Sequence, residues 1–242
     1  MTDLAGERPP ITLQGGITRS PVEGDGWGGG VLSLPSRWLG RLRYDDAHSL
    51  QIRVRDAIIG GGSNRELLLL EHEPVITYGR RGELGDVLVS PTELAKLGIS
   101  LRAAERGGRA TYHAPGQLVG YPIVRLRTLA PSVPAYVWGL EDALIGTAAR
   151  LGVVSGRREG LHGVWVGNAK LTSIGIAITH GVCWHGFALN VDPDLSRFDL
   201  IRPCGLEAPT TSIAALVGHA PPVEDVATLV AEEIARVFPL PR

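Results

Sequence analysis

Four consecutive leucines, Leu67 to Leu70, stand between Glu66 and Glu71 in a chain of 242 residues. A short apolar run bounded by charges is typical of a strand buried on both faces, although this pattern alone also allows a short buried helical segment. A chain of this length can bury a sizeable core as one large domain or two small ones. Because the sequence contains no internal repeat and no second linker, one domain is the simplest organisation.

Apolar residues elsewhere in the chain recur at helical or strand spacing. The helical spacing predicts helices over the segments 45–60, 91–98, 137–151, 212–217 and 226–237. The β-rich runs predict strands over the segments 75–80, 86–90, 121–126, 163–166, 170–178 and 182–191. Gly167 and Asn168 lie between two of these strands, and this pair is typical of a hairpin turn.

The composition limits the classes of protein to which this chain can belong. Hydrophobic residues make up 44% of the chain and charged residues 20%, which is ordinary for a globular protein. The formal net charge of -1 gives no electrostatic reason to expect nucleic acid or an anionic membrane surface as a partner. No apolar run approaches the ~20 residues that a membrane-spanning helix needs.

The first thirty residues differ from the rest because they are rich in glycine, proline, threonine and serine. We expect residues 1–30 to form a flexible tail and residues 31–242 to form the single domain. The tail lacks the apolar core of a signal peptide, and its acidic residues argue against a transit peptide. Two cysteines cannot make a disulfide framework, so we expect a cytoplasmic, reducing setting.

One of these cysteines, Cys204, stands between Pro203 and Gly205. Proline restricts the backbone on one side, and glycine permits a positive φ or a close approach on the other. This context suits a small side chain that is presented at a sharp turn, as a nucleophile must be. The alternative is that Cys204 is a small buried hydrophobic residue, which is the usual fate of a free cysteine.

The segment from Arg106 to Gln117 contains many residues of the types that commonly bind ligands. Gly107 and Gly108 let backbone N–H groups approach a ligand closely, and Arg106 and Arg109 bring positive charge beside them. An isolated glycine pair also occurs in solvated hairpin turns. The tyrosine, histidine, proline and glutamine that follow favour a site loop, and the spacing matches neither a P-loop nor a dinucleotide fingerprint.

Groups of residues along segment 40–217 resemble the lipoyl(octanoyl) transferases, in that family's order. They are His72-Glu73-Pro74 with Thr77-Tyr78-Gly79-Arg80, Arg106-Gly107-Gly108 with Thr111-Tyr112-His113-Ala114-Pro115-Gly116-Gln117, Gly163-Val164-Trp165 with Lys170 and Ile174-Gly175, His185-Gly186-Phe187-Ala188-Leu189-Asn190, and Pro203-Cys204-Gly205 with Thr211-Ser212. The chain departs from the family at Ala114, where a His-Gly-Pro-Gly-Gln motif usually has glycine. Residues 1–30 lie outside the resemblance and inherit nothing from it.

The resemblance implies an α/β fold, a mixed β-sheet flanked by helices that is shared with biotin and lipoate protein ligases. It also implies an acyltransferase that needs no cofactor. The octanoyl group would leave octanoyl-acyl carrier protein and end as an amide on a lysine of a lipoyl domain, the first step of endogenous protein lipoylation. The implied acceptors are the lipoyl domains of 2-oxo-acid dehydrogenase acyltransferase subunits and the glycine cleavage H protein. We expect a monomer.

The resemblance also assigns roles to residues. The cysteine matching Cys204 is the acyl-carrying nucleophile, and the lysine matching Lys170 is its catalytic partner. The residues implied to line the acyl pocket are Arg106, Gly107, Gly108, Arg109, Ala110, Thr111, Tyr112, His113, Ser173, Ile174, Gly175, Gly186, Phe187 and Ala188. We expect no metal site, because His72, His162, His180, His185 and Cys183 have no metal-ligand spacing.

The chemistry of a cysteine and a lysine supports this assignment. An unperturbed cysteine with a pKa of ~8.5 is only a few per cent thiolate at neutral pH, and a close ammonium group lowers that pKa by ~1–3 units. Strand alternation puts Lys170 on the same face as Ile174 and Ile176, so its amine should be partly desolvated, although an exposed hairpin lysine is the alternative. Once Cys204 is acylated, Lys170 can act as a base toward the incoming amine.

Two other functions remain open from the residues alone. An ATP-dependent lipoate or biotin ligase on the same fold would not need Cys204, and its activity would depend on ATP and a free acid. A non-catalytic module that binds carrier proteins would not need Cys204 either.

Overall fold

The computed structural model describes residues 34–62, 65–202 and 208–239. The predicted tail and the predicted nucleophile Cys204 therefore lie outside the described residues. The helices are α1 Tyr44–Ile59, α2 Pro91–Lys96, α3 Leu126–Leu129, α4 Val133–Arg150, α5 Ile213–Val217 and α6 Val223–Val237, with 3-10 turns at Leu84–Asp86 and Leu195–Leu200. The strands are β1 Ser36–Leu42, β2 Glu66–His72, β3 Val75–Tyr78, β4 Ser100–Ala103, β5 Ala110–His113, β6 Gln117–Arg125, β7 Gly156–Arg158, β8 Leu161–Val166, β9 Ala169–Lys170, β10 Thr172–Thr179 and β11 Val182–Asn190.

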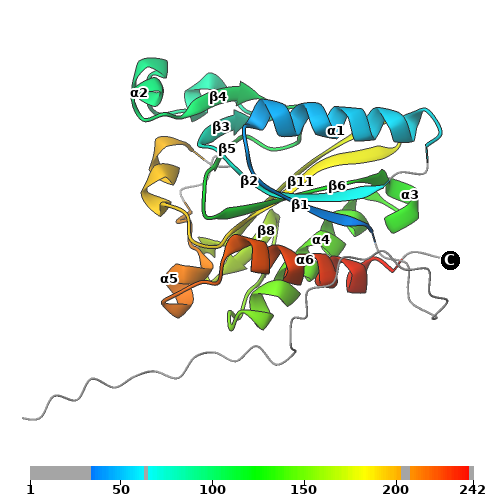
Figure 1. Cartoon of the computed structure of the whole chain (residues 1–242). Coiled ribbons are helices and arrows are strands. Elements are labelled where there is room, and N and C mark those ends of the chain that lie inside the picture. The colour runs from blue at the N-terminus through cyan, green and yellow to red at the C-terminus, as the bar shows by residue number, and fades with distance from the viewer. Residues whose placement is uncertain (1–33, 63–64, 203–207, 240–242) are drawn as a thin grey trace, which may run out of the picture. The chain divides into compact units, whose positions relative to one another are not determined.

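The central element is a five-stranded sheet with the order β1-β2-β6-β11-β10. Strands β1 and β2 are parallel, and the other neighbours in this sheet are antiparallel. Helix α1 lies over one face of the sheet, whereas α4 and α6 lie over the other (Figure 1). The mixed sheet flanked by helices is therefore confirmed.

The leucine run occupies β2, near the middle of this sheet. Leu67 and Leu69 belong to the core cluster beneath α4 and α6, whereas Leu68 and Leu70 belong to the cluster beneath α1. All four side chains are at most 2% exposed. The strand is buried on both faces, as the sequence predicts, because successive side chains of a strand point to opposite faces.

Two three-stranded sheets, β4-β3-β5 and β7-β8-β9, accompany the central sheet. The prediction of one strand over 170–178 is wrong, because the chain passes from one sheet to another at Leu171. Lys170 pairs with Trp165 in the small sheet, and β10 pairs with β11 in the large one. Leu171 is fully buried in the core, and its N–H donates to the carbonyl of Val164. That burial fixes the point where the chain changes sheets.

The predicted strand over 86–90 is also wrong. Asp86 ends a 3-10 turn, and Val87 makes only an isolated bridge to Ile201. The Asp86 carboxylate accepts hydrogen bonds from the backbone N–H of Glu83 and from the guanidinium of Arg109, which favours a turn over an extended strand. No helix in the described part of the chain is long and apolar enough to cross a membrane.

Candidate active site

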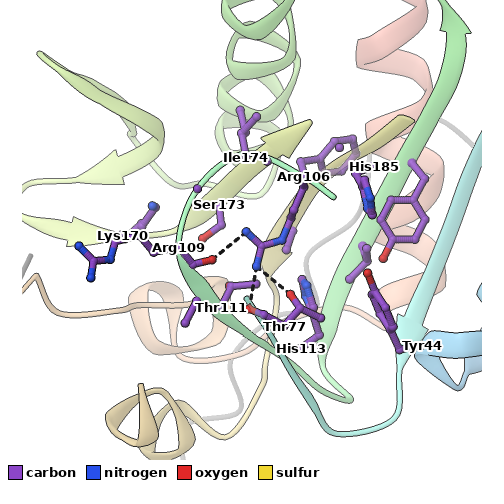
Figure 2. Close-up of a pocket in the computed structure, with 18 residues that line it drawn as sticks. Tyr44, Thr77, Arg106, Arg109, Thr111, His113, Lys170, Ser173, Ile174 and His185 are labelled. Carbon is purple, nitrogen blue, oxygen red and sulfur yellow. Dashed lines mark hydrogen bonds between the residues drawn. The ribbon is translucent and has the colours of Figure 1, made fainter. Parts of the chain in front are cut away.

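A pocket lies between β5, the loop that precedes it and the paired strands β10 and β11 (Figure 2). Its lining is Tyr44, Thr77, Arg106, Gly108, Arg109, Ala110, Thr111, His113, Val119, Tyr121, Lys170, Ser173, Ile174, Gly175, His185, Gly186, Phe187 and Ala188. Figure 2 shows Lys170 at one end of this lining and Tyr44 and His185 at the other. The pocket therefore runs from Lys170 toward Tyr44 and His185.

Two short segments of the β10–β11 hairpin form one wall of this pocket. Antiparallel pairing sets Ser173 opposite Ala188, and Gly175 opposite Gly186. A Cβ at Gly186 would overlap the backbone of Gly120, and a Cβ at Gly120 would in turn overlap a neighbouring phenylalanine ring. Glycine is thus required here for close packing of the pocket wall.

The loop before β5 is held by the side chain of Arg106. Its guanidinium donates to the carbonyl and hydroxyl of Thr77 at 2.8 and 2.7 Å, and to the carbonyls of Gly107 and Arg109 at 3.0 Å each (Figure 2). Arg109 in turn forms a 2.7 Å ion pair with the buried Asp86. The hydrogen bond from Arg109 lowers the pKa of Asp86 below its ordinary value. These arginines therefore shape the loop.

Lys170 is fixed through its backbone. Its N–H donates to the carbonyl of Pro209 at 2.8 Å, and its carbonyl accepts from the N–H of Thr211 at 2.9 Å. The Lys170 ammonium lies 5.3 Å from the centre of the Trp165 ring, within the range of a cation–π contact. The lysine is thus tied to the segment that follows Cys204 in the sequence.

Glu141 supports the hairpin that carries Lys170. This buried carboxylate accepts a hydrogen bond from the backbone N–H of Gly163 at 2.9 Å and pairs with Arg157 at 2.8 Å. Gly163 has a φ of +110°, and a Cβ there would lie 3.2 Å from the Lys170 side chain and overlap the carbonyl of Thr172. A charged side chain from α4 thereby fixes the backbone beside the lysine.

A second, larger cavity of about 440 Å³, the outer cavity, also has Lys170 in its lining. Both cavities are lined by Gly108, Arg109, Lys170, Ile174 and Gly175. Lys170 therefore stands where a narrow inner pocket and a wider outer cavity meet. A reacting group held beside this lysine could contact both spaces.

The inner end of the narrow pocket is lined by Tyr44, His113, Tyr121 and His185, and His72 is hydrogen-bonded to Tyr121 outside the lining. The Nδ1–H of His72 donates to the carbonyl of Leu42 at 3.2 Å, so its Nε2 accepts from the Tyr121 hydroxyl at 2.7 Å. Burial lowers the pKa of His72 to about 4 and that of His113 to about 3. Burial also raises the pKa of the Tyr44 hydroxyl. At neutral pH His72, His113 and the Tyr44 hydroxyl are therefore uncharged.

A hydrogen-bonded chain leads from His113 to the Lys170 region. Gln117 accepts from the Nδ1–H of His113 at 2.7 Å and donates to Asn190 at 2.8 Å. Asn190 donates to the carbonyl of Thr211 at 2.9 Å. Because Thr211 is bonded to the Lys170 carbonyl, the chain joins the wall of the pocket to the lysine.

His48, Glu105 and His185 also lie together, with one potential metal-ligating atom from each within 4.8 Å of the others. Glu105 lies 3.6 Å from His185 and 3.0 Å from His48, and these neighbouring imidazoles lower its pKa to about 2. Burial lowers the pKa of His185, so at neutral pH its contact with Glu105 joins a neutral imidazole and a carboxylate. The expectation that the protein has no metal site stays a prediction.

Most of the residues that the sequence analysis assigned to the acyl pocket lie together, but two do not line it. Gly107 lines the outer cavity, and the Tyr112 ring packs against Phe198 at 5.5 Å on the far side of β5. Ala114 is buried in the same cluster as Tyr112, and its φ is not positive, so alanine needs no special backbone conformation there. Cys204 lies outside the described residues.

The sequence analysis missed five residues of the lining: Tyr44, Thr77, Val119, Tyr121 and His185. His185 stands inside the motif that supplies Gly186 to Ala188, and that position was the available signal. It has a φ of +55°, which is uncommon for a residue other than glycine. Val119 and Tyr121 share a face of β6 at strand spacing, whereas nothing local distinguishes Tyr44.

The chain is similar to known proteins over most of its length. Residues 43–235 match the family described as the lipoyl protein ligase A/B catalytic domain. The octanoyltransferase of Chloroflexus aurantiacus is 45% identical over 212 residues, covering 86% of this chain and 95% of that protein. The octanoyltransferase of Solibacter usitatus is 45% identical over 202 residues, covering 84% and 91%.

Solved structures share the fold at low identity. The putative lipoate protein ligase Ta0514 from T. acidophilum superposes with a TM-score of 0.66 at 15% identity, covering 85% of each chain. Lipoate-protein ligase A bound with ATP gives 0.65 at 16% identity, again covering 85% of each chain. From its sequence relatives and its fold, this chain belongs to the lipoyl protein ligase A/B catalytic domain family, within which the relatives named above are octanoyltransferases.

Proposed function

We propose that this protein is an octanoyltransferase of protein lipoylation. The donor is octanoyl-acyl carrier protein, and the acceptors are lysines of lipoyl domains of 2-oxo-acid dehydrogenase acyltransferase subunits and of the glycine cleavage H protein. We place the reaction in the cytoplasm and the enzyme as a monomer. The observation that carries the proposal is the position of Lys170, at the junction of a narrow inner pocket and a wide outer cavity.

In the first step the thiolate of Cys204 attacks the carbonyl carbon of the donor thioester. A bond forms between the sulfur of Cys204 and this carbon, and the bond to the carrier sulfur breaks. The carrier sulfur leaves as a thiol after taking a proton from the Lys170 ammonium, which becomes a neutral amine. The ammonium of Lys170 favours the thiolate form of Cys204 before the attack. One thioester replaces another, so the step needs no ATP.

In the second step the amine of the acceptor lysine attacks the octanoyl-Cys204 thioester. The carbon–nitrogen bond forms, Lys170 accepts a proton from the attacking amine, and the bond to the sulfur of Cys204 breaks. The product amide is more stable than the thioester, which makes the transfer favourable. Because acylation removes the negative charge from Cys204, Lys170 is then suited to act as the base.

The narrow pocket supports an acyl chain as the group transferred. The small residues Gly175, Gly186 and Ala188 leave space along one wall, and Ile174 and Phe187 add apolar surface beside the polar residues of the lining. The open volume is about 50 Å³, which is room for only a few water molecules. We therefore expect side chains at the mouth to move when an eight-carbon chain enters.

Intact-mass spectrometry tests the proposal. The protein is incubated with octanoyl-acyl carrier protein in the absence of ATP, and we expect a mass gain of one octanoyl group that hydroxylamine removes. Cys204→Ser should not form this hydroxylamine-sensitive adduct. Absence of the adduct on the wild type, or an undiminished one on Cys204→Ser, would refute the covalent mechanism. A ligase would instead modify a lipoyl domain only with ATP and free octanoate.

The role of Lys170 has a separate test. We expect Lys170→Ala to raise the thiol pKa of Cys204, because a cation that favours the thiolate has been removed. The rate of alkylation by iodoacetamide, measured against pH, reports that pKa. An alkylation profile identical to that of the wild type would show that Lys170 does not activate the thiol.

A further inference from the structure

The narrow pocket runs across the face of the central sheet that α1 covers. The pairing sets Ser173 of β10 opposite Ala188 of β11, and Ala188 opposite Val119 of β6. All three residues line the pocket, and they form one row over three neighbouring strands. Lys170 lies two residues before β10. An acyl chain that enters beside Lys170 would therefore run across the strands and not along one of them.

The span of this row matches the length of an eight-carbon chain. Neighbouring strands of a sheet lie ~4.8 Å apart, so β10 and β6 are separated by about 10 Å. An extended octanoyl group measures about 9 Å from its carbonyl carbon to its methyl carbon. An octanoyl group whose carbonyl lies beside Lys170 would therefore end over β6.

The row does not continue onto β2, which is the next strand of the sheet. Leu70 of β2 pairs with Val119, but its side chain is fully buried in the core and lies outside the pocket lining. Tyr44 lines the pocket from the first position of α1, and its ring packs against His72 of β2 with ring centres 5.5 Å apart. The Tyr44 ring therefore lies beside the strand at which the row ends.

Tyr44 differs from Tyr121 and His113, which line the same end, in how its side chain is held. Tyr121 and His113 each form a side-chain hydrogen bond of 2.7 Å, to His72 and Gln117 respectively. The Tyr44 hydroxyl has no hydrogen-bond partner within the described residues, and its ring is held by packing. A smaller side chain at position 44 therefore opens this end of the pocket without breaking a side-chain hydrogen bond between described residues.

We propose that the Tyr44 ring sets the upper length of the acyl chain, an inference that rests on the proposed function. An octanoyl group fills the row from β10 to β6, and its methyl group meets this ring. A decanoyl group is about 2.5 Å longer, so it must displace the ring or keep its carbonyl away from Lys170. The limit on chain length is thus imposed by α1 and not by the hairpin that carries Lys170.

A competition between two donors tests this proposal. The full-length enzyme is mixed with equal amounts of octanoyl- and decanoyl-acyl carrier protein without ATP, and intact-mass spectrometry gives the initial ratio of decanoyl- to octanoyl-enzyme. This ratio equals the ratio of the two kcat/KM values for loading, so a general loss of activity cancels. We expect Tyr44→Ala to raise the ratio about tenfold, because each additional buried methylene strengthens binding about fourfold.

A milder substitution and a matched control accompany this variant. Tyr44→Leu shortens the side chain but keeps it apolar, so it preserves more of the packing and should raise the ratio about threefold. Tyr136→Leu is the control, because Tyr136 is also a buried tyrosine whose hydroxyl has no partner among the described residues. It belongs to the core cluster on the opposite face of the sheet, outside the pocket lining. Its ratio should equal that of the wild type.

The outcomes separate this inference from the proposed function. If the wild type takes up no acyl group from either donor, the proposed function fails, and this inference fails with it. If the wild type loads octanoyl but Tyr44→Ala and Tyr44→Leu keep its ratio, only the role of Tyr44 is wrong. An equal shift in Tyr136→Leu would also overturn that role, because general loosening of the fold would explain it. A wild type that loads decanoyl as fast as octanoyl would show that the pocket end imposes no limit.

Discussion

Lowering the pH from 7 to 5 should destabilise the fold through two buried histidines, His72 and His113. Burial lowers the pKa of His72 to about 4 and that of His113 to about 3, so both remain neutral in the folded protein at pH 5. In the unfolded chain each would have an ordinary pKa of ~6.5 and would bind a proton. The unfolded state therefore binds more protons than the folded state in this range, and acid favours unfolding.

The magnitude follows from the difference between those pKa values. A group that is protonated only in the unfolded chain costs ~1.4 kcal/mol of stability for each pH unit below 6.5. Between pH 7 and pH 5 this amounts to about 2 kcal/mol for each histidine, or about 4 kcal/mol for His72 and His113 together. The pKa values of Asp45, Asp86 and Glu105 are lowered in the fold, so these carboxylates titrate below this window.

Urea unfolding at pH 7 and pH 5 measures this loss through the extrapolated free energy of unfolding. In the His72→Gln variant the difference between the two pH values should shrink by about 2 kcal/mol, because one titrating group has been removed. Glutamine can still hydrogen-bond to Tyr121. The matched control is His219→Gln, which replaces an exposed histidine and should leave the pH difference unchanged.

The result that would refute this reasoning is a His72→Gln variant with the full wild-type pH difference. It would mean that His72 is protonated in the folded protein, or that the unfolded chain does not protonate it. If the difference between the free energies of unfolding at pH 7 and pH 5 disappeared in His219→Gln, surface charge would be the cause of the pH dependence. Each variant is compared with itself at the two pH values, so a general loss of stability does not affect the conclusion.

Three substitutions test the packing around the site. Gly120→Ala would place a methyl group against the Phe187 ring. We expect the free energy of unfolding, measured with urea, to fall by about 1–3 kcal/mol and octanoyl loading to become slower. Wild-type values of both quantities would contradict the close packing of Gly120 against this ring. Gly116 has a φ of +85° and no room for a Cβ beside Asp192, so Gly116→Ala should lower the melting temperature by more than Gly120→Ala does. A smaller decrease would show that alanine is not strained at this position. Glu141→Gln should cost about 2 kcal/mol and speed amide hydrogen exchange in β8, and unchanged exchange would mean that this carboxylate does not hold the hairpin.

Much of the fold could be predicted because the signals are local. The four leucines of β2, the helical spacing in α4 and α6 and the turn at Gly167 each depend on neighbours in the sequence. The two strand predictions are wrong because contacts between distant segments determine the structure there. The alternating pattern continues through Leu171, but this side chain enters the core. The hydrogen-bonded pairing therefore passes from the small sheet to the central sheet at this residue. The pairing of Asp86 with Arg109, which supports a turn, joins residues 23 positions apart.

The candidate site was predictable in part. The loop from Arg106 to His113 is conspicuous because glycine, arginine and histidine lie close together in the sequence. The polar inner end of the pocket is different, since Tyr44 begins a helix and Tyr121 reads only as a strand residue. They meet because α1 packs across the face of the central sheet on which the Tyr121 side chain lies. No local pattern carries that information.

The attachment of Lys170 explains why its role can be tested cleanly. Its position depends on main-chain hydrogen bonds to Pro209 and Thr211, which any residue at this position except proline could make. The Trp165 ring that faces its ammonium is itself anchored in β8. Truncation to alanine therefore removes the charge while the backbone contacts remain available. A shifted thiol pKa in Lys170→Ala would then measure the electrostatic influence of the lysine on Cys204, and not the collapse of the hairpin.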